Sequence, residues 1–205
     1  MLLSTAYFPP VSYFALLARA EGTVFIDAGS HYVKQSWRNR CRILTAGGPE
    51  CLNVPVVHGH DLFHTPVGEV RVDYSTPWLP KTQRAIATAY ESSPFFMYYR
   101  DALWELLEQR PETLFELNLQ LIRFFCAKIG IAPELEPLRE FVPAGERPLD
   151  YREAMHPKRP DTVLRDLGLE RPYWQVFRDR YGFVPGLSVM DLLFNEGPES
   201  ICFLK

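Results

Sequence analysis

The sequence predicts an α/β or α+β fold in which an N-terminal mixed β-sheet is followed by a helical middle layer and a C-terminal helical tail. Three observations predict it. Most segments with strand-like character lie in residues 1–76, and apolar residues recur at helical spacing over residues 77–130. Residues 131–205 begin rich in proline and charge and end in short helical segments. We expect residues 1–205 to form a single domain, since 205 residues with 47% hydrophobic content can bury one core.

The chain opens with a predicted strand–helix–strand unit. Leu2–Tyr7 is apolar and is closed by two prolines, and Ser12–Ala20 fits one or two helical turns. Thr23–Asp27 is β-branched and aromatic, as strands are. A helix between two strands favours parallel pairing of those strands.

The next strands are predicted by alternation and turn residues. Residues 41–57 alternate on both sides of Gly47-Gly48-Pro49, which predicts a β-hairpin. Glu69–Tyr74 also alternates with period two and predicts another strand. Together with the opening unit, these segments predict a mixed sheet of about five strands.

Helices are predicted next, with apolar residues three and four positions apart. Gly130 is the expected C-terminal cap of the last helix in the middle layer. Residues 131–172 are expected to form a long ordered loop, with weak strand potential near Leu138–Val142. The predicted helices are Pro77–Glu91, Asp101–Gln109, Glu112–Ile129, Tyr173–Tyr181 and Ser188–Asn195.

Composition excludes several classes of protein. Lys plus Arg number 22 against 25 Asp plus Glu, a net charge of −3, so we expect no general nucleic-acid binding. No apolar run approaches the roughly 18 residues that a membrane span needs. The start MLLSTAYFPP lacks the basic region of a secretory signal, so we expect a cytoplasmic protein. The cysteines form no CxxC pair and are expected to be buried, reduced thiols.

No standard catalytic motif is present, whether GxSxG, GxxxxGK[ST], HExxH or GxGxxG after a strand. His58, His60 and His64 form a histidine cluster in VHGHDLFH, which suggests a transition-metal site. The segment needs no metal to be a solvated loop, which is the favoured interpretation, and no matching ligand set occurs elsewhere. We therefore expect no bound metal, and the sequence identifies no cofactor.

The most polar stretch follows the Thr23–Asp27 strand, where open sheets place their ligands. Lys34 and Arg40, together with Arg38 and Arg42, can pair with phosphate or carboxylate oxygens. Gln35 and Asn39 supply paired donors and acceptors suited to a sugar or an amide. The alternative is an ordinary exposed basic loop.

Two further polar clusters are candidates. Asp73 at the end of a predicted strand and Lys81 on the following helix could serve as general base and electrostatic clamp. In the alternative, Ser75 or Thr76 in this stretch simply caps that helix. Lys158 lies in the basic run His156–Arg159, which could equally be a solvated charged surface.

Several longer stretches carry a resemblance to a known family. They are YFPPVSYFALLARAEGTVFIDAGSHYVKQSWRNRCRI, VPVVHG, EVRVDYSTPW with Lys81, and YWQVFRDRYGFVPGLSVMDLLFNEGPES. From about Tyr7 to Ser200 the chain resembles the WbqC-like protein family, most specifically in KQSWRNRCRI and LSVMDLLFNEGPES. The positions that match the family pattern are Lys34, Gln35, Asn39, Arg40, Asp73, Lys81, Lys158, Asp191 and Asn195.

The resemblance implies a bacterial, cytoplasmic protein that makes or modifies a sugar or another small metabolite, because family members often accompany genes for surface-polysaccharide assembly. It brings no settled catalytic residues with it. The function hypothesis is a group-transfer enzyme acting on a phosphorylated or nucleotide-linked sugar, or on an activated acyl or amino compound. The alternative is a non-catalytic scaffold of a biosynthetic complex, favoured by the aromatic stretch Phe95–Tyr99.

The enzyme hypothesis assigns a role to each candidate residue. Asp73 would be the general base, and Lys81 would act with it. Arg40, Lys34 and Lys158 would bind an anionic small-molecule substrate, whereas Gln35, Asn39 and Asn195 would orient the acceptor. We expect the groups Asp27–Arg40, Asp73–Lys81 and Asn195 to meet on one concave surface. The oligomeric state does not follow from the sequence.

Overall fold

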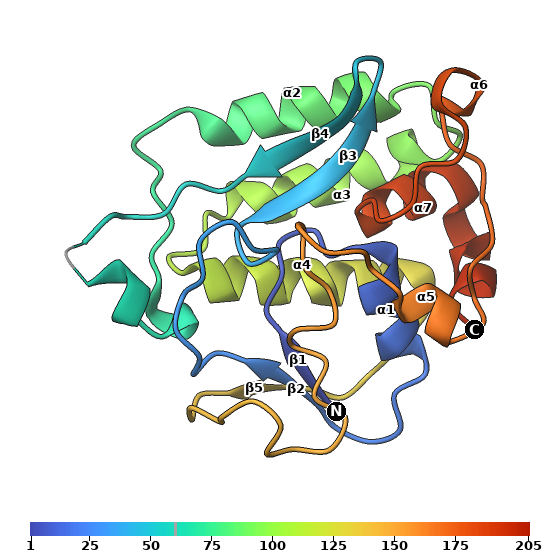
Figure 1. Cartoon of the computed structure of the whole chain (residues 1–205). Helices are drawn as coiled ribbons and strands as arrows, with labels where there is room; N and C mark the ends of the chain where they lie inside the picture. Colours follow the sequence, from blue (N-terminus) through green and yellow to red (C-terminus); the bar gives the residue numbers. More distant parts are fainter. Residues whose placement is uncertain (60) are drawn as a thin grey trace.

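The computed structural model, which describes residues 1–59 and 61–205, contains two separate sheets surrounded by helices (Figure 1). The larger sheet has three parallel strands in the order β1-β2-β5, formed by Leu2–Ser4, Val24–Asp27 and Leu135–Leu138. Leu3 pairs with Ile26, and Ile26 with Pro137. The fold is therefore mixed α/β, as the sequence predicts.

The predicted strand–helix–strand opening is confirmed. Helix α1 (Val11–Ala18) connects β1 to β2, and these strands are parallel, with Ser4 opposite Asp27. All but the last residue of α1 are buried, so this helix lies inside the protein. Because the strands are parallel, Ser4 and Asp27 end at the same edge of the sheet, where the next segments leave it.

The predicted hairpin is also confirmed, but it forms a sheet of its own. Strands β3 (Arg40–Thr45) and β4 (Gly48–Asn53) pair antiparallel and have no ladder to the parallel sheet. The expected single mixed sheet is therefore wrong for the part of the chain that the structure describes. The hairpin packs instead against α2 (Trp78–Tyr90), which lies alongside it in Figure 1.

The expectation of a strand over Glu69–Tyr74 is wrong. Residues Val67–Glu69 form a 3₁₀ turn, and Arg71 and Val72 make only isolated bridges. The reason is that this segment lies against the start of a helix and not against another strand. The Val72 N–H bonds to the Glu112 carbonyl and the Val70 carbonyl accepts from Leu114 N–H, so its backbone groups pair with the start of a helix.

Helix α4 (Leu114–Ile129) is the longest, and both of its ends are capped as the sequence predicts. Thr113 and Glu116 form a reciprocal capping box, and Gly130 adopts φ 83° at the C-terminal end. The other helical segments are α3 (Phe96–Glu108), α5 (Val163–Asp166), α6 (Arg178–Tyr181), α7 (Val189–Glu196), and 3₁₀ helices at Leu62–His64 and Gly197–Phe203.

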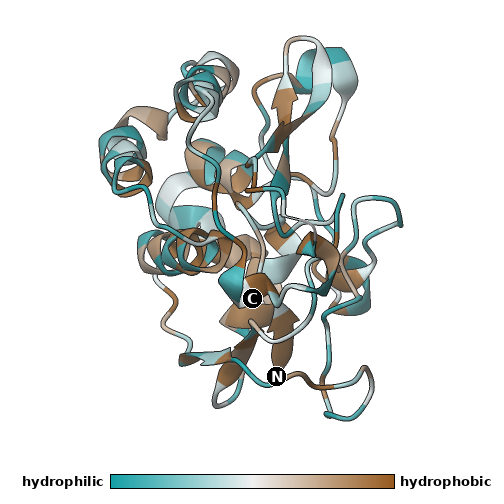
Figure 2. Ribbon diagram, turned by 90° about the vertical axis from the view of Figure 1, so that its left-hand side faces the viewer, coloured by the Kyte–Doolittle hydropathy of each residue, from teal (hydrophilic) through white to brown (hydrophobic). Residues whose placement is uncertain are grey.

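The core lies between the parallel sheet and the helices that cover it. Ten of the 16 residues of α4 are buried, as are seven of the eight in α7. In Figure 2 the strand beside the N-terminus has the brown colour of hydrophobic residues, whereas the helices alternate between brown and teal. None of the helices within residues 1–59 and 61–205 combines the length and apolar character that a bilayer crossing requires.

Three smaller expectations need correction. The helix predicted over Tyr173–Tyr181 is limited to α6, because Tyr173 and Gln175 are buried and hydrogen-bonded to Asp191 of α7 instead of continuing the helix. Likewise only Cys41 and Cys126 are buried. Cys51 and Cys202 are exposed, and all four thiols are free. The strand expected near residues 138–142 lies earlier, at β5.

Candidate functional site

The segment of residues 28–39, here called the β2–β3 connection, leaves the carboxyl end of β2 and holds three of the predicted site residues, Lys34, Gln35 and Asn39, with Arg40 directly after it. Its last three residues are anchored to the protein body. The carbonyls of Trp37 and Asn39 accept hydrogen bonds from the Tyr7 and Val54 N–H groups, each at 2.8 Å. The Arg38 carbonyl accepts one from Asn118 Nδ2, also at 2.8 Å. The connection lacks regular secondary structure but has a fixed backbone.

The beginning of the connection is fixed by Asp27. Its Oδ1 accepts hydrogen bonds from the N–H groups of Gly29 and Ser30 at 3.1 and 3.0 Å. Gly29 is required for a different reason, since a Cβ atom there would overlap the backbone of Arg139 and Glu140 after β5. The two loops therefore leave the sheet in close contact.

One side of the connection forms a pocket with the hairpin, here called the hairpin pocket, with a volume of about 410 Å³. Four predicted residues line it. These are Lys34, Gln35, Asn39 and Arg40. His58 and Trp78 are also among the lining residues. Residues singled out as a substrate-binding cluster in the sequence thus share one cavity.

Two polar atoms in the hairpin pocket are buried without a hydrogen-bond partner among the described residues. They are Asn39 Oδ1 and Arg40 Nε. Asn39 Nδ2 is engaged with the Val54 carbonyl at 3.0 Å, so the orientation of the amide leaves its oxygen as a free acceptor. Arg40 takes part in none of the ion pairs found in residues 1–59 and 61–205. The Arg40 guanidinium can therefore pair with an anionic ligand without breaking an ion pair to the described residues.

The backbone of one lining residue of this pocket, Gln35, has an unusual conformation. Gln35 has φ 61°, in the left-handed region that residues other than glycine rarely occupy. The adjacent Ser36 hydroxyl donates to the Val33 carbonyl at 2.6 Å, which holds this tight turn. Strained residues of this kind concentrate at ligand sites.

Asp73 lies beside the hairpin pocket but does not line it. Its N–H bonds to the carbonyl of Pro55, a lining residue, at 2.9 Å. Hydrogen bonds from Ser75 hold the pKa of the Asp73 carboxyl below its ordinary value, and His58 lowers it further. Asp73 is therefore ionised at neutral pH and a weak proton acceptor. Ser75 and Thr76 do not cap α2, whose N-cap is Pro77.

The remaining predicted residues lie elsewhere, so the three polar groups do not meet on one concave surface. Lys81 lines a separate surface hollow with Arg84 and Glu50. Asn195 is only 4% exposed and donates from Nδ2 to the Asp191 carbonyl at 2.7 Å. Lys158 is exposed and does not line the hairpin pocket.

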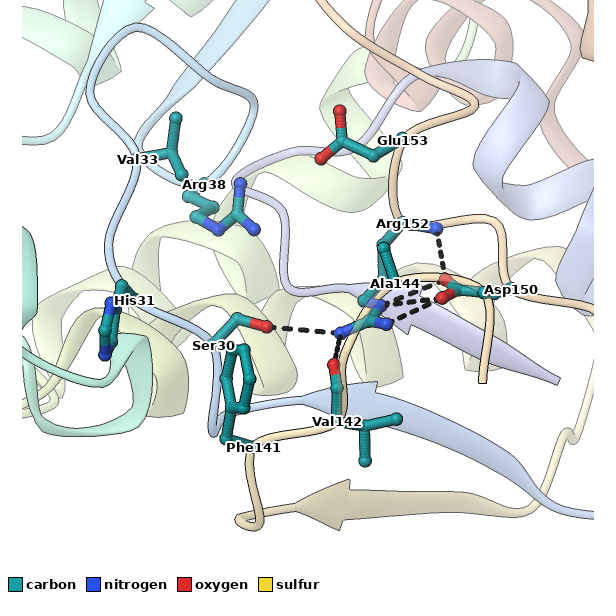
Figure 3. Close-up of a pocket in the computed structure, with 11 residues that line it drawn as sticks. Ser30, His31, Val33, Arg38, Phe141, Val142, Ala144, Asp150, Arg152 and Glu153 are labelled. Atoms are coloured by element: carbon teal, nitrogen blue, oxygen red, sulfur yellow. Dashed lines mark hydrogen bonds and ion pairs between the residues drawn. The ribbon is translucent and has the colours of Figure 1, made fainter. Parts of the chain in front are cut away.

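A second cavity, here called the sheet-end pocket, lies on the other side of the connection and has a volume of about 470 Å³ (Figure 3). It lies at the carboxyl end of β2, and its lining includes Ser30, Arg38, Phe141 and Arg152. Sequence reasoning named Arg38 only as one of several arginines and treated His58 only as a metal candidate. Nothing in the sequence distinguished the pocket-facing arginines from the others.

The histidine cluster can be assessed only in part, because His60 lies outside the described residues. His64 Nδ1 lies 2.9 Å from Asp61 Oδ1, whereas His58 lines the hairpin pocket. Within the described chain, no group of three or more His, Cys, Asp or Glu residues is placed to hold a metal ion.

Comparison with known proteins identifies the family. The profile of the WbqC-like protein family matches residues 5–158, which include both pockets. The chain belongs to the WbqC-like protein family. It is also similar to "Uncharacterized protein Rv1507c" of Mycobacterium tuberculosis (strain ATCC 25618 / H37Rv). The two are 27% identical over 226 residues, covering 100% of this chain and 96% of the mycobacterial protein. No solved structure matches the chain.

The extent of the WbqC-like match separates the candidate residues. Lys34, Gln35, Asn39 and Arg40 lie well inside the matched range, whereas Asn195 on α7 lies beyond its end at residue 158. The part of the chain recognised as WbqC-like therefore contains the whole lining of both pockets.

Proposed function

We propose that this WbqC-like protein is a group-transfer enzyme of bacterial surface-polysaccharide synthesis that binds a phosphorylated or nucleotide-linked sugar in the hairpin pocket. The observation that carries the proposal is that two cationic side chains, Arg40 and Lys34, line the same cavity as the amides Gln35 and Asn39. Cations suit the phosphate and amides suit the sugar hydroxyls.

Each residue of the pocket has a role in this proposal. Arg40 and Lys34 bind the phosphate oxygens, and Gln35 and Asn39 orient the sugar. His58 takes the proton from the acceptor hydroxyl or amine as the acceptor forms a bond to C1 of the donor sugar. The bond from C1 to the phosphate oxygen breaks, and the phosphate or nucleotide leaves bound to Arg40 and Lys34. His58 is assigned this role because it lines the pocket, whereas Asp73 does not. The neighbouring Asp73 stabilises the imidazolium that forms. Lys81, Lys158 and Asn195 lie outside the pocket and have no role in this step.

The alternative, a non-catalytic scaffold protein, draws on the aromatic stretch Phe95–Tyr99. In that stretch Phe96 belongs to the core, and only Met97 and Tyr98 are largely exposed, at 54% and 80%. Two adjacent side chains do not make the broad apolar patch that a docking surface needs. The lined cavity therefore favours the enzyme over the scaffold.

Ligand screening by thermal shift and calorimetry tests the proposal. Sugar phosphates, nucleotide sugars and acyl donors are compared on the wild type, on Arg40→Gln and on Arg84→Gln, an exposed arginine of α2 outside the pocket. We expect a phosphorylated or nucleotide-linked sugar to bind the wild type and Arg84→Gln, and to bind Arg40→Gln at least about tenfold more weakly. Absence of binding, or equal binding by all three proteins, would contradict the proposal.

A further inference from the structure

Arg38 is a buried cation without a counter-ion in contact with it. Its side chain is only 7% exposed, and its guanidinium makes no hydrogen bond or ion pair with the described residues. Burial lowers the pKa of Arg38, and the carboxylates of Asp27 and Glu153 offset this only in part. A guanidinium kept in such a place usually has a binding partner, because burying it alone is unfavourable.

Of the nearby carboxylates, Asp150 and Glu153 are paired with other arginines, whereas Asp27 Oδ2 has a longer contact with Arg152 and no hydrogen bond to the described residues. Arg152 binds Asp150 through Nε and Nη2, at 3.0 and 2.6 Å, and its Nη1 lies 3.5 Å from Asp27 Oδ2. Glu153 pairs with Arg159 at 2.7 Å. Arg38 thus remains as the cation of this pocket whose donors are free.

Arg152 has a structural role in the same pocket. In addition to the carboxylates, it donates to the Val142 carbonyl at 2.8 Å, to the Pro143 carbonyl at 3.2 Å and to Ser30 Oγ at 3.2 Å. All of its hydrogen-bonding nitrogens are therefore occupied, and it joins the loop after β2 to the loop after β5. Since Ser30 Oγ accepts from Arg152, its own hydroxyl hydrogen is available to a ligand.

The shape of the pocket indicates what the partner of Arg38 is. Figure 3 shows the Arg38 guanidinium directed into the space bounded by Ser30, Arg152 and Glu153. Apolar side chains form much of the wall, namely Val33, Phe141, Val142 and Ala144. The ring centres of His31 and Phe141 lie 6.0 Å apart with an angle of 30° between the ring planes, so the lining includes two neighbouring aromatic rings against which a flat apolar group can pack.

We propose that the sheet-end pocket is a second binding site, separate from the hairpin pocket, for a small organic carboxylate with a flat apolar body. The Arg38 guanidinium and the Ser30 hydroxyl bind the carboxylate, and Phe141 packs against the apolar body. A single negative charge matches the single cation with free donors. A phosphate dianion fits less well, because Asp150 and Glu153 also face this space.

Calorimetry with benzoate, phenyl phosphate and acetate tests this assignment. We expect the wild type to bind benzoate saturably, phenyl phosphate more weakly and acetate weakest. In Arg38→Met, which keeps the length and the packing of the side chain, benzoate binding falls about tenfold or more. Arg40→Gln, in the hairpin pocket, leaves benzoate binding unchanged.

Thermal unfolding of the same variants separates binding from structure. Because Arg38 has no hydrogen-bond or ion-pair partner among residues 1–59 and 61–205, Arg38→Met is expected to keep or raise the melting temperature, whereas Arg152→Met lowers it by breaking the links between loops. The assignment is overturned if the wild type binds none of the probes, if phenyl phosphate binds more tightly than benzoate, or if Arg38→Met binds benzoate as the wild type does. A fall in melting temperature for Arg38→Met as large as that for Arg152→Met would likewise make Arg38 a structural residue.

Discussion

Asn118, a fully buried amide in the middle of α4, donates a 2.8 Å hydrogen bond from Nδ2 to the carbonyl oxygen of Arg38. The same nitrogen lies 3.2 Å from Thr5 Oγ1, just after β1. One side chain of the helical layer therefore fixes the backbone between the two pockets, with Arg38 facing one of them and Asn39 and Arg40 the other. Burial raises the pKa of Tyr32, which lines the hairpin pocket, and the charges of Arg40 and Arg38 lower it in part.

Replacing Asn118 is expected to disturb both pockets at once. Asn118→Leu removes the hydrogen bond and leaves the Arg38 carbonyl buried without a partner, so the free energy of unfolding falls by about 1–3 kcal/mol. Ligand affinity falls at both pockets. Urea unfolding measures the stability, with Arg123→Leu on the exposed face of α4 as the matched control, expected to change it by less than about 0.5 kcal/mol. Equal effects of the two variants would show that the bond to Arg38 contributes little.

Arg40→Lys is expected to separate binding from folding in the hairpin pocket. The substitution keeps the charge but removes the forked geometry, so affinity for a phosphorylated ligand falls by on the order of 1–3 kcal/mol. Arg40 forms none of the ion pairs within the described chain, so the melting temperature of the Arg40→Lys variant should hardly differ from that of the wild type. Calorimetry and thermal unfolding are run in parallel. A destabilised variant whose folded fraction binds as tightly as the wild type would refute the role of Arg40 in binding.

Gly29→Ala is expected to destabilise the protein and distort the sheet-end pocket. The new methyl group meets the backbone of Arg139 and Glu140, which cannot rotate away as a flexible side chain could. We expect a loss of about 1–3 kcal/mol in the free energy of unfolding, the usual effect of overpacking. The control is Gly47→Ala in the hairpin turn, where the nearest atom is the Thr45 hydroxyl oxygen at 3.6 Å. A harmless Gly29→Ala would mean that the two loops separate easily.

Asp191 is expected to make stability fall as the pH rises. Burial raises the pKa of its carboxyl from 3.8 to about 6, although hydrogen bonds from Tyr173 and Gln175 lower it in part. Between about pH 4 and pH 6 the folded protein therefore keeps a proton that the unfolded chain has released. Over this window Asp191 reduces the free energy of unfolding by on the order of 3 kcal/mol, and above it the effect is constant.

Asp191→Asn isolates that contribution from the other titrating groups. The variant cannot release this proton, so its stability relative to the wild type is expected to increase as the pH is raised from 4 to 7. Urea unfolding of both proteins across this range measures the difference. Parallel stability profiles for the two proteins would exclude Asp191 as the source of the pH dependence.

Local signals in the sequence were enough to predict several elements. The capping box at Thr113 and the glycine at position 130 marked the ends of α4, and the Gly-Gly-Pro turn marked the hairpin. The strand–helix–strand opening followed from its short-range pattern. These features depend on residues close in sequence, which interact in much the same way in any fold.

The clustering of Lys34, Gln35, Asn39 and Arg40 in one pocket was partly accessible too, because they lie within seven residues of one another. The prediction that Lys81 and Asn195 join that cluster is wrong. Their types and positions suit a site, but α2 presents Lys81 to a different hollow, and α7 buries Asn195 against its own backbone.

Only the tertiary structure decided which charged groups have partners. The sequence determined the helices, the hairpin, the parallel opening and a basic, amide-rich loop after β2, because propensity, turn chemistry and capping act over a few residues. It could not show that Arg152 pairs with Asp150 and lies near Asp27. Arg38 carries the same charge but is buried without a carboxylate partner among the described residues. Pairing and burial depend on which loops meet in space, and the contact between the loops after β2 and β5 joins residues more than 100 positions apart.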